Sequence, residues 1–149
     1  MNTVSVSLQQ QADYRFEIRF GEGISSLIAD EPAPLGKGGG PSPAQLLCAS
    51  VGNCLSDSLL FALRKFTEAP GPRRGEVAAA VGRTAVGRLR IRSVHSTITL
   101  GVVANSLEHL ERALTQCEEF CTVTQSVRQA VPVRVTVIDA AGHTLRDQS

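Results

Sequence analysis

The chain has 149 residues, of which 42% are apolar and 19% are charged, and its formal net charge is +1. This length and balance predict one globular domain over residues 1–149 that can bury about 68–70% of its unfolded surface without metal or disulfide support. The near-neutral charge excludes a global field that would recruit nucleic acid or anionic lipid. The unusual feature is four cysteines, Cys48, Cys54, Cys117 and Cys121.

The N-terminus predicts an unexported protein. Residues 1–6 contain neither a basic segment nor an apolar core of the kind found in secretory signals. The longest apolar stretch, residues 46–63, is interrupted by Ser50, Asn53 and Asp57, so we expect no membrane span. The expected location is cytoplasmic, where structural disulfides are rare. The cysteines are therefore buried thiols, metal ligands or redox groups.

Apolar and polar residues alternate with period two over residues 3–8 and 14–20, which predicts two strands joined by a hairpin over residues 9–13. A third short strand is expected over residues 24–29. The following residues, 30–43, are rich in Pro and Gly. They predict a loop that is either mobile or held by partners.

A helix is expected from Pro43 to about Phe66, with Ser42 as its N-cap. This segment is apolar on most of its circumference. A helix of that kind is buried on both sides. We expect the sheet on one side and a second subunit on the other.

Residues 68–75 break the chain, and two strands are expected over residues 76–85 and 89–102. Arginines at positions 88, 90 and 92 would line one face of the second of these strands. No aromatic residues interleave with them to stack bases, so we interpret a solvated face rather than a nucleic-acid site.

A second helix is expected to begin at a capping box formed by Asn105 and Glu108. Its three/four spacing would place Cys117 and Cys121 on one inward face. Residues 122–128 predict a bend or a short helix. The last strand is expected over residues 131–137, at a sheet edge because it contains Pro132, and the tail beyond it is polar.

The cysteine spacings, C-x5-C and C-x3-C on helices, do not bring ligands together as zinc sites require, so no metal is expected. Cys54 and Cys121 could be in contact if their helices pack against each other. Such a contact would be either a functional redox pair or a chance contact between two buried thiols. A redox role requires a thiolate, and apolar burial opposes thiolate formation. Cys54 lies too far along its helix to gain from the helix dipole, so a cation, most naturally an arginine, would have to stabilise it.

Several segments together resemble a known family. They are Asp30-Glu31-Pro32 before a glycine run, Gly40-Pro41-Ser42-Pro43-Ala44-Gln45-Leu46-Leu47, Gly52-Asn53-Cys54 and Cys121-Thr122-Val123. In this order and spacing the chain resembles the OsmC/Ohr family, the osmotically inducible and organic hydroperoxide resistance proteins, and within it the OsmC-like branch. The resemblance covers nearly the whole chain.

The resemblance implies an α+β fold of the OsmC type, with antiparallel sheets, two central cysteine-bearing helices and an intertwined homodimer. It implies that Cys54 is the peroxidatic thiol, which attacks an organic hydroperoxide, and that Cys121 resolves the product as a disulfide. No bound cofactor is implied. External thiol reductants, lipoyl dithiols among them, would restore the two thiols.

The resemblance also implies an arginine that polarises the thiolate and a glutamate that steers this arginine. Arg19 is the predicted arginine, with Arg15 and Lys37 as alternatives. Ala44 stands where the family has its glutamate. The neighbouring Gln45 is predicted to line the substrate site, where it could hydrogen-bond an arginine but could not ionise.

Two further positions bear on the chemistry. Thr122 replaces the usual proline after the second cysteine, and Asp57 shares a helix face with Cys54, where its charge opposes a thiolate. Cys48 and Cys117 are expected to be packing residues. The favoured function is a thiol-dependent hydroperoxide reductase. The alternatives are a dimeric small-ligand-binding protein without peroxidase turnover and a structural dimer with buried cysteines.

Overall fold

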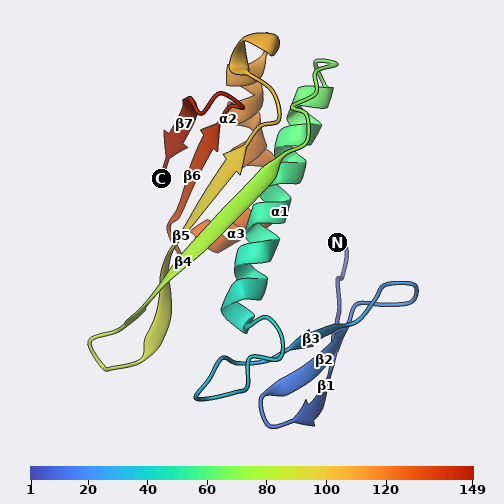
Figure 1. Ribbon diagram of the computed structural model, residues 1–149, viewed down its shortest axis with the longest axis vertical. Coiled ribbons are helices and arrows are strands. Elements are labelled where there is room, and N and C mark those ends of the chain that lie inside the picture. Colours follow the sequence, from blue (N-terminus) through green and yellow to red (C-terminus); the bar gives the residue numbers. More distant parts are fainter. The chain divides into compact units, whose positions relative to one another are not determined.

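The computed structural model describes residues 1–149 (Figure 1). Its contacts divide the chain into two compact units, Met1–Leu47 and Cys48–Ser149. The two units are described separately below. The sequence-based assignment of one domain to residues 1–149 stays a prediction.

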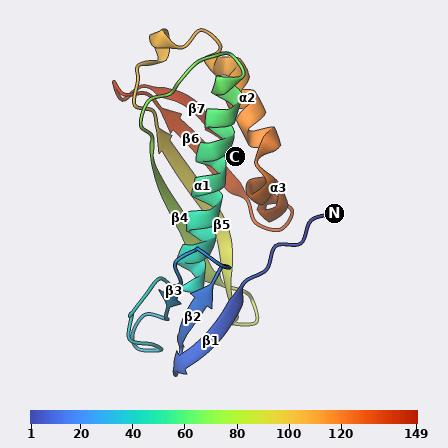
Figure 2. The same cartoon turned by 90° about the vertical axis from the view of Figure 1, so that its right-hand side faces the viewer.

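The first unit contains a three-stranded antiparallel sheet in the order β1-β2-β3 (Figures 1 and 2), formed by β1 (Ser7–Ala12), β2 (Arg15–Arg19) and β3 (Leu27–Ala29). Three strands were predicted, and the predicted hairpin between the first two is confirmed. Its position differs, because the first strand is Ser7–Ala12 rather than residues 3–8 and the turn does not span residues 9–13. The turn lies at Asp13 and Tyr14, and Asp13 has a positive φ of 48°. Aspartate is one of the few residues that accept this backbone conformation readily, so the turn sets the register and residues 9–12 pair as strand.

The loop after β3 is organised by one of its own side chains. Asp30 is only 4% exposed, and its carboxylate accepts backbone N–H groups from Glu31 at 2.8 Å, Lys37 at 3.3 Å and Gly39 at 3.0 Å. These hydrogen bonds hold the pKa of Asp30 below its usual value, and the bond from Gly39 has the largest effect. The positive charge of the nearby Arg15 lowers the pKa further. The Pro/Gly-rich segment is therefore anchored internally, which neither sequence-based alternative anticipated.

Helix α1 (Pro43–Arg64) begins in the first unit and continues into the second. Ser42 is its N-cap, as predicted. The Ser42 Oγ accepts the N–H of Gln45 at 3.3 Å, and the Gln45 Oε1 accepts the N–H of Ser42 at 2.8 Å. This reciprocal pair is a capping box with glutamine at its third position. The helix ends two residues earlier than expected.

The second unit contains a four-stranded sheet in the order β4-β5-β6-β7. Its strands are β4 (Arg74–Arg83), β5 (Leu89–Thr99), β6 (Val133–Ile138) and β7 (Thr144–Gln148). The pair β5–β6 is parallel and the other pairs are antiparallel, so the expectation of purely antiparallel sheets is wrong for this sheet.

The predicted edge position of the last valine strand is also wrong. Strand β6 lies between β5 and β7, with Val133, Val135 and Val137 all at 0–1% exposure. Pro132 precedes the strand, where it needs no N–H donor, and its carbonyl accepts the N–H of Val94 at 2.9 Å. The edge strands of this sheet are β4 and β7, and β7 was not predicted because its sequence is polar.

Two helices, α2 (Leu110–Phe120) and α3 (Thr122–Arg128), connect β5 to β6. The predicted capping box at Asn105 is not formed, because residues 104–106 make a short 3₁₀ turn and α2 begins later. The carboxylate of Glu68 instead accepts the N–H groups of the two residues before α2, Glu108 at 2.6 Å and His109 at 3.1 Å. A long-range carboxylate therefore holds the segment that leads into α2 and places a negative charge at the positive end of the helix dipole.

Helices α1, α2 and α3 lie on one side of the four-stranded sheet (Figures 1 and 2). One continuous apolar core joins them to β5 and β6. Its fully covered members include Val51, Leu55, Leu59, Leu63 and Leu114. Helix α1 has the length and the mean hydropathy, 1.6, of a membrane span, contrary to the expectation that its polar residues would exclude one. Only 28% of this apolar window is buried within the chain, because the helix packs one face into the core and leaves the other exposed, so the expected burial on both sides is not found within one chain.

A buried ion triad ties the α2–α3 connection to the sheet. The Glu118 side chain is 7% exposed, and its carboxylate forms ion pairs with Arg128 Nη2 at 2.7 Å and Arg146 Nε at 2.9 Å. Arg128 also donates to the carbonyl of Val133 at 3.0 Å. The three residues come from α2, α3 and β7, so the triad fixes the ends of the segment that contains Cys121.

Replacement of Glu118 with alanine should lower the free energy of unfolding by about 3 kcal/mol, because two poorly exposed arginines lose their counter-charge. Urea denaturation of the wild type and the variant measures this loss. The control is Glu119→Ala at the adjacent exposed position, which should stay within about 0.5 kcal/mol of the wild type. Equal effects at the two positions would contradict the role of the triad.

Candidate functional site

The structure brings together the two cysteines that spacing alone left open as a pair. Cys54 lies in the middle of α1 and is half-buried, whereas Cys121 is fully buried between the last residue of α2 and the first of α3. The Cys54 side chain lies close enough to Cys121 to raise the pKa of the Cys121 thiol, and both thiols are free. The prediction that Cys121 lies within a helix is wrong in detail. It occupies the bend between two helices, which turns its side chain toward α1.

The Cys121 thiol has a second polar neighbour. Its Sγ–H donates to Thr124 Oγ1 at 3.0 Å, and Thr124 is itself fully buried. Burial raises the pKa of Cys121 above its ordinary value, and the contact with Cys54 raises it further, whereas the bond to Thr124 acts in the opposite direction. At neutral pH Cys121 is therefore a neutral thiol.

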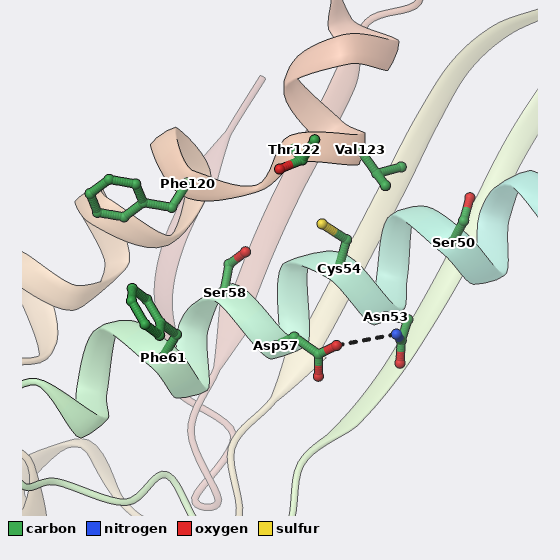
Figure 3. Close-up of a pocket in the computed structure, with 9 residues that line it drawn as sticks. All are labelled: Ser50, Asn53, Cys54, Asp57, Ser58, Phe61, Phe120, Thr122 and Val123. Atoms are coloured by element: carbon green, nitrogen blue, oxygen red, sulfur yellow. Dashed lines mark hydrogen bonds between the residues drawn. The ribbon is translucent and has the colours of Figure 1, made fainter. Parts of the chain in front are cut away.

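Cys54 opens onto a groove with a volume of about 680 Å³. The groove is lined by residues of α1 and of the α2–α3 connection, namely Ser50, Asn53, Cys54, Asp57, Ser58, Phe61, Phe120, Thr122 and Val123. In Figure 3 the Cys54 sulfur points toward Thr122 and Val123 at the start of α3. A small molecule in the groove would thus meet Cys54 directly, while Cys121 stays covered behind it.

The charge of the groove is negative. Its one charged lining residue is Asp57, whose Oδ2 accepts the side-chain N–H of Asn53 at 3.2 Å (Figure 3). No cation is among the lining residues. The expected cationic neighbour of Cys54 is therefore not supplied by the groove walls of the second unit.

One end of the groove is aromatic. The rings of Phe61 and Phe120 meet edge to face, with centroids 6.5 Å apart and planes at 82°. The ammonium group of Lys65 lies 4.7 Å from one centroid and 4.5 Å from the other. Both rings are about half exposed, so they offer an apolar surface that could hold the organic part of a ligand.

The remaining cysteines differ from this pair. Cys117 is fully buried, its thiol donates to the carbonyl of Leu114 at 3.2 Å, and burial raises its pKa to about 12. A thiol of this kind is inert at neutral pH. Cys48 is half-buried at the start of the second unit. The surroundings of Cys117 agree with the packing role that we expected for it.

The other predicted site residues lie in the first unit. The Arg19 side chain is 62% exposed, and its Nη2 pairs with Glu17 at 2.7 Å. Arg15 is beside Asp30, and Lys37 contributes its backbone N–H to the same carboxylate. The side-chain oxygen of Gln45 is engaged in the α1 capping box. The catalytic role of Arg19 and the substrate-binding role of Gln45 stay predictions.

Sequence reasoning missed three groups at this site. Thr124 was not singled out, although a hydroxyl residue three positions after a cysteine can return to it across a helical turn. The Phe61–Phe120 pair joins elements that are distant in the sequence, and no local pattern signals it. Glu118 was missed because nothing in its neighbourhood distinguishes a buried glutamate from an exposed one.

Comparison with protein families identifies the family of the chain. Residues 36–136 match the family model described as OsmC-like protein, a range that contains both Cys54 and Cys121. The chain therefore belongs to the OsmC-like protein family, as its sequence motifs predicted. No curated protein matches the sequence significantly.

Solved structures show the same fold at low sequence identity. An OsmC-like protein of unknown function from Vibrio cholerae has a TM-score of 0.76 at 17% identity, over 93% of this chain and 100% of the other. An organic hydroperoxide resistance protein OsmC from Legionella pneumophila has a TM-score of 0.70 at 17% identity, over 92% and 97%. The organic hydroperoxide resistance protein OhrB of Bacillus subtilis has a TM-score of 0.69 at 16% identity, over 91% and 98%.

The depth at which α1 lies against β4 depends on Gly52, two residues before Cys54. A Cβ atom at this position would be 2.6 Å from Cγ2 of Val77, closer than real contacts allow. Gly52→Ala should therefore destabilise the protein by about 1–3 kcal/mol despite the gain in helix propensity. Thermal or urea unfolding measures the change.

The matched variant is Val77→Ala, which removes the methyl group that the new Cβ would meet. In the double variant the alanine at position 52 should be tolerated, so the two substitutions should be strongly non-additive. Additive effects would show that Gly52 is not the point of close approach.

Proposed function

We propose that this protein is a thiol-dependent reductase of organic hydroperoxides. The observation that carries the proposal is the contact between Cys54, which opens onto the groove, and Cys121, which is buried behind it. One thiol is accessible to a small molecule and the other only to the first thiol. The family, together with neighbours named as organic hydroperoxide resistance proteins, supports a role in peroxide stress.

The proposed chemistry begins at Cys54. Its thiolate attacks the terminal oxygen of the hydroperoxide, the O–O bond breaks, and the organic part leaves as an alcohol after taking up a proton. Cys54 is left as a sulfenic acid. The Cys121 thiol then attacks the Cys54 sulfur, so that a disulfide forms and the hydroxyl group leaves as water. An external dithiol reduces this disulfide by exchange and is itself oxidised.

The groove favours an organic over an inorganic peroxide. Phe61 and Phe120 offer apolar surface at one end, and Val123 adds to it near the Cys54 sulfur (Figure 3). Burial of an alkyl or aryl group there would contribute about 25 cal/mol per Å² of apolar surface removed from water. Hydrogen peroxide has no group that could use this surface.

Activation of Cys54 requires a cation that the groove walls do not supply. We propose that Arg19 provides it within a homodimer, in which the exposed side of α1 with Asn53, Asp57 and Phe61 packs against a second subunit. Exposed apolar side chains on β1 and beside it, Val6 at 50% and Leu8 at 60%, support such a partner surface. The expected location of the dimer is the cytoplasm.

A second candidate function is a dimeric small-ligand-binding protein without peroxidase turnover. Two observations favour it. By its resemblance to the family, the chain has Ala44 where a glutamate is expected, and Asp57 places a negative charge in the groove near Cys54. Both oppose a Cys54 thiolate, yet neither affects the capacity of the groove to hold an organic molecule.

Thiol counting after one equivalent of cumene hydroperoxide separates the two functions. A reductase should rapidly lose two of its four free thiols, and Cys54→Ser should abolish the loss. The matched control, Cys48→Ser, should still lose two thiols, because Cys48 lies outside the pair. Survival of all four thiols in excess hydroperoxide would exclude the reductase and favour the binding protein.

A further inference from the structure

A buried hydroxyl is in direct contact with the second thiol of the pair. Thr124 and Cys121 are both at 0% exposure, and the distance between Thr124 Oγ1 and Cys121 Sγ is 3.0 Å. The Cys121 side chain thus has both Cys54 of α1 and Thr124 of α3 as neighbours. Any reaction of the Cys121 sulfur with Cys54 takes place with this hydroxyl group at hydrogen-bonding distance.

The orientation of Thr124 differs from that of other hydroxyl side chains on these helices. Thr115 Oγ1 donates to the carbonyl of Glu111 at 3.1 Å, and Ser126 Oγ donates to the carbonyl of Thr122 at 2.9 Å. Those are the usual bonds to the residue four positions earlier. Thr124 instead accepts a hydrogen bond from the thiol, so its oxygen is directed at a group that can react.

From this contact we infer that Thr124 is a catalytic residue of disulfide formation, and that its hydroxyl stabilises the negative charge developing on Cys121 during attack at Cys54. The inference rests on the proposed function for its biological setting. At rest the thiol donates to the Thr124 oxygen. When the S–H bond breaks, a rotation about the C–O bond allows the Thr124 hydroxyl to donate to sulfur instead.

The step balances without a further reactant. Cys121 loses its proton and forms the S–S bond, while the S–O bond of the Cys54 sulfenic acid breaks. The proton joins the departing hydroxide to give water. Cys121 is oxidised, Cys54 is reduced, and Thr124 is unchanged at the end.

The apolar environment of Cys121 opposes formation of its thiolate, so stabilisation by the Thr124 hydroxyl is needed. Cys121 lies in an apolar core that raises the pKa of its thiol, and the neighbouring Cys54 raises it further. Hydrogen bonds to charged groups are about twice as strong as neutral ones and are shielded from water at a buried site. Loss of the hydroxyl should therefore slow the attack of Cys121 by about tenfold or more.

The test uses Thr124→Val, which keeps the shape and removes the hydroxyl, and Thr124→Ser, which keeps the hydroxyl. Thr115→Val is the matched control, the same substitution at an exposed position of α2 that does not line the groove. All are made in a Cys48→Ser background. The probe is dithiobis(nitrobenzoate). Its first coloured thiolate reports reaction at Cys54, and its second reports attack of Cys121 on the mixed disulfide.

In Thr124→Val the second phase should slow about tenfold or more, with the first phase unchanged and the pH midpoint of the second phase moved upward. Thr124→Ser should stay within about threefold of the parent, and Thr115→Val should have the same rates as the parent. The inference is overturned if Thr124→Val keeps the parent rate, if Thr124→Ser is as slow as Thr124→Val, or if the parent shows no second phase.

Two further measurements keep the outcome clear. Circular dichroism shows whether Thr124→Val folds. If it does not, the ratio of the second-phase rates of Thr124→Ser and Thr124→Ala measures the effect of the hydroxyl group instead. Repeating the assay with cumene hydroperoxide separates the two proposals. A parent that shows the second phase but does not react with the hydroperoxide would refute the proposed function and leave the role of Thr124 standing.

Discussion

The burial of helix α1 against the four-stranded sheet is the constraint on which the site depends. Val51, Leu55 and Leu59 are removed completely from water on one side of the helix, so the helix cannot rotate without exposing them. Cys54 adjoins this buried stripe, and its sulfur is therefore held at the border between the core and the groove (Figure 3). Gly52 sets how closely the same segment approaches β4.

The partner thiol is placed by a different kind of interaction. Cys121 lies at a bend between two short helices, which are weak elements by themselves. The bend is held by the ion triad of Glu118 with Arg128 and Arg146, together with a bond from the Gln125 side chain to the Glu118 carbonyl at 2.7 Å. Apolar packing thus positions one cysteine and buried charge the other, and the two meet in a contact that neither element specifies alone.

Local patterns predicted much of this arrangement. The Ser42 cap, helix α1 and the strands before and after it follow from periodicity and capping, which act over a few residues. The predictions were wrong where a distant group decided the outcome. Glu68 holds the segment before α2 where a capping box at Asn105 was expected, and β7 pairs with β6 despite its polar sequence. The contact between Cys54 and Cys121 could be suggested from spacing, but it required the three-dimensional packing to distinguish it from other pairs of buried thiols.

The electrostatics of the groove leave the activation of Cys54 as the central physical question. The groove contributes a carboxylate and no cation, and the chain has only three histidines that could act as a base. The most direct test is disulfide mapping by mass spectrometry after treatment with one equivalent of cumene hydroperoxide. The account predicts a Cys54–Cys121 disulfide within one chain. A Cys117–Cys121 linkage, or a Cys54 sulfinic acid without any disulfide, would contradict it.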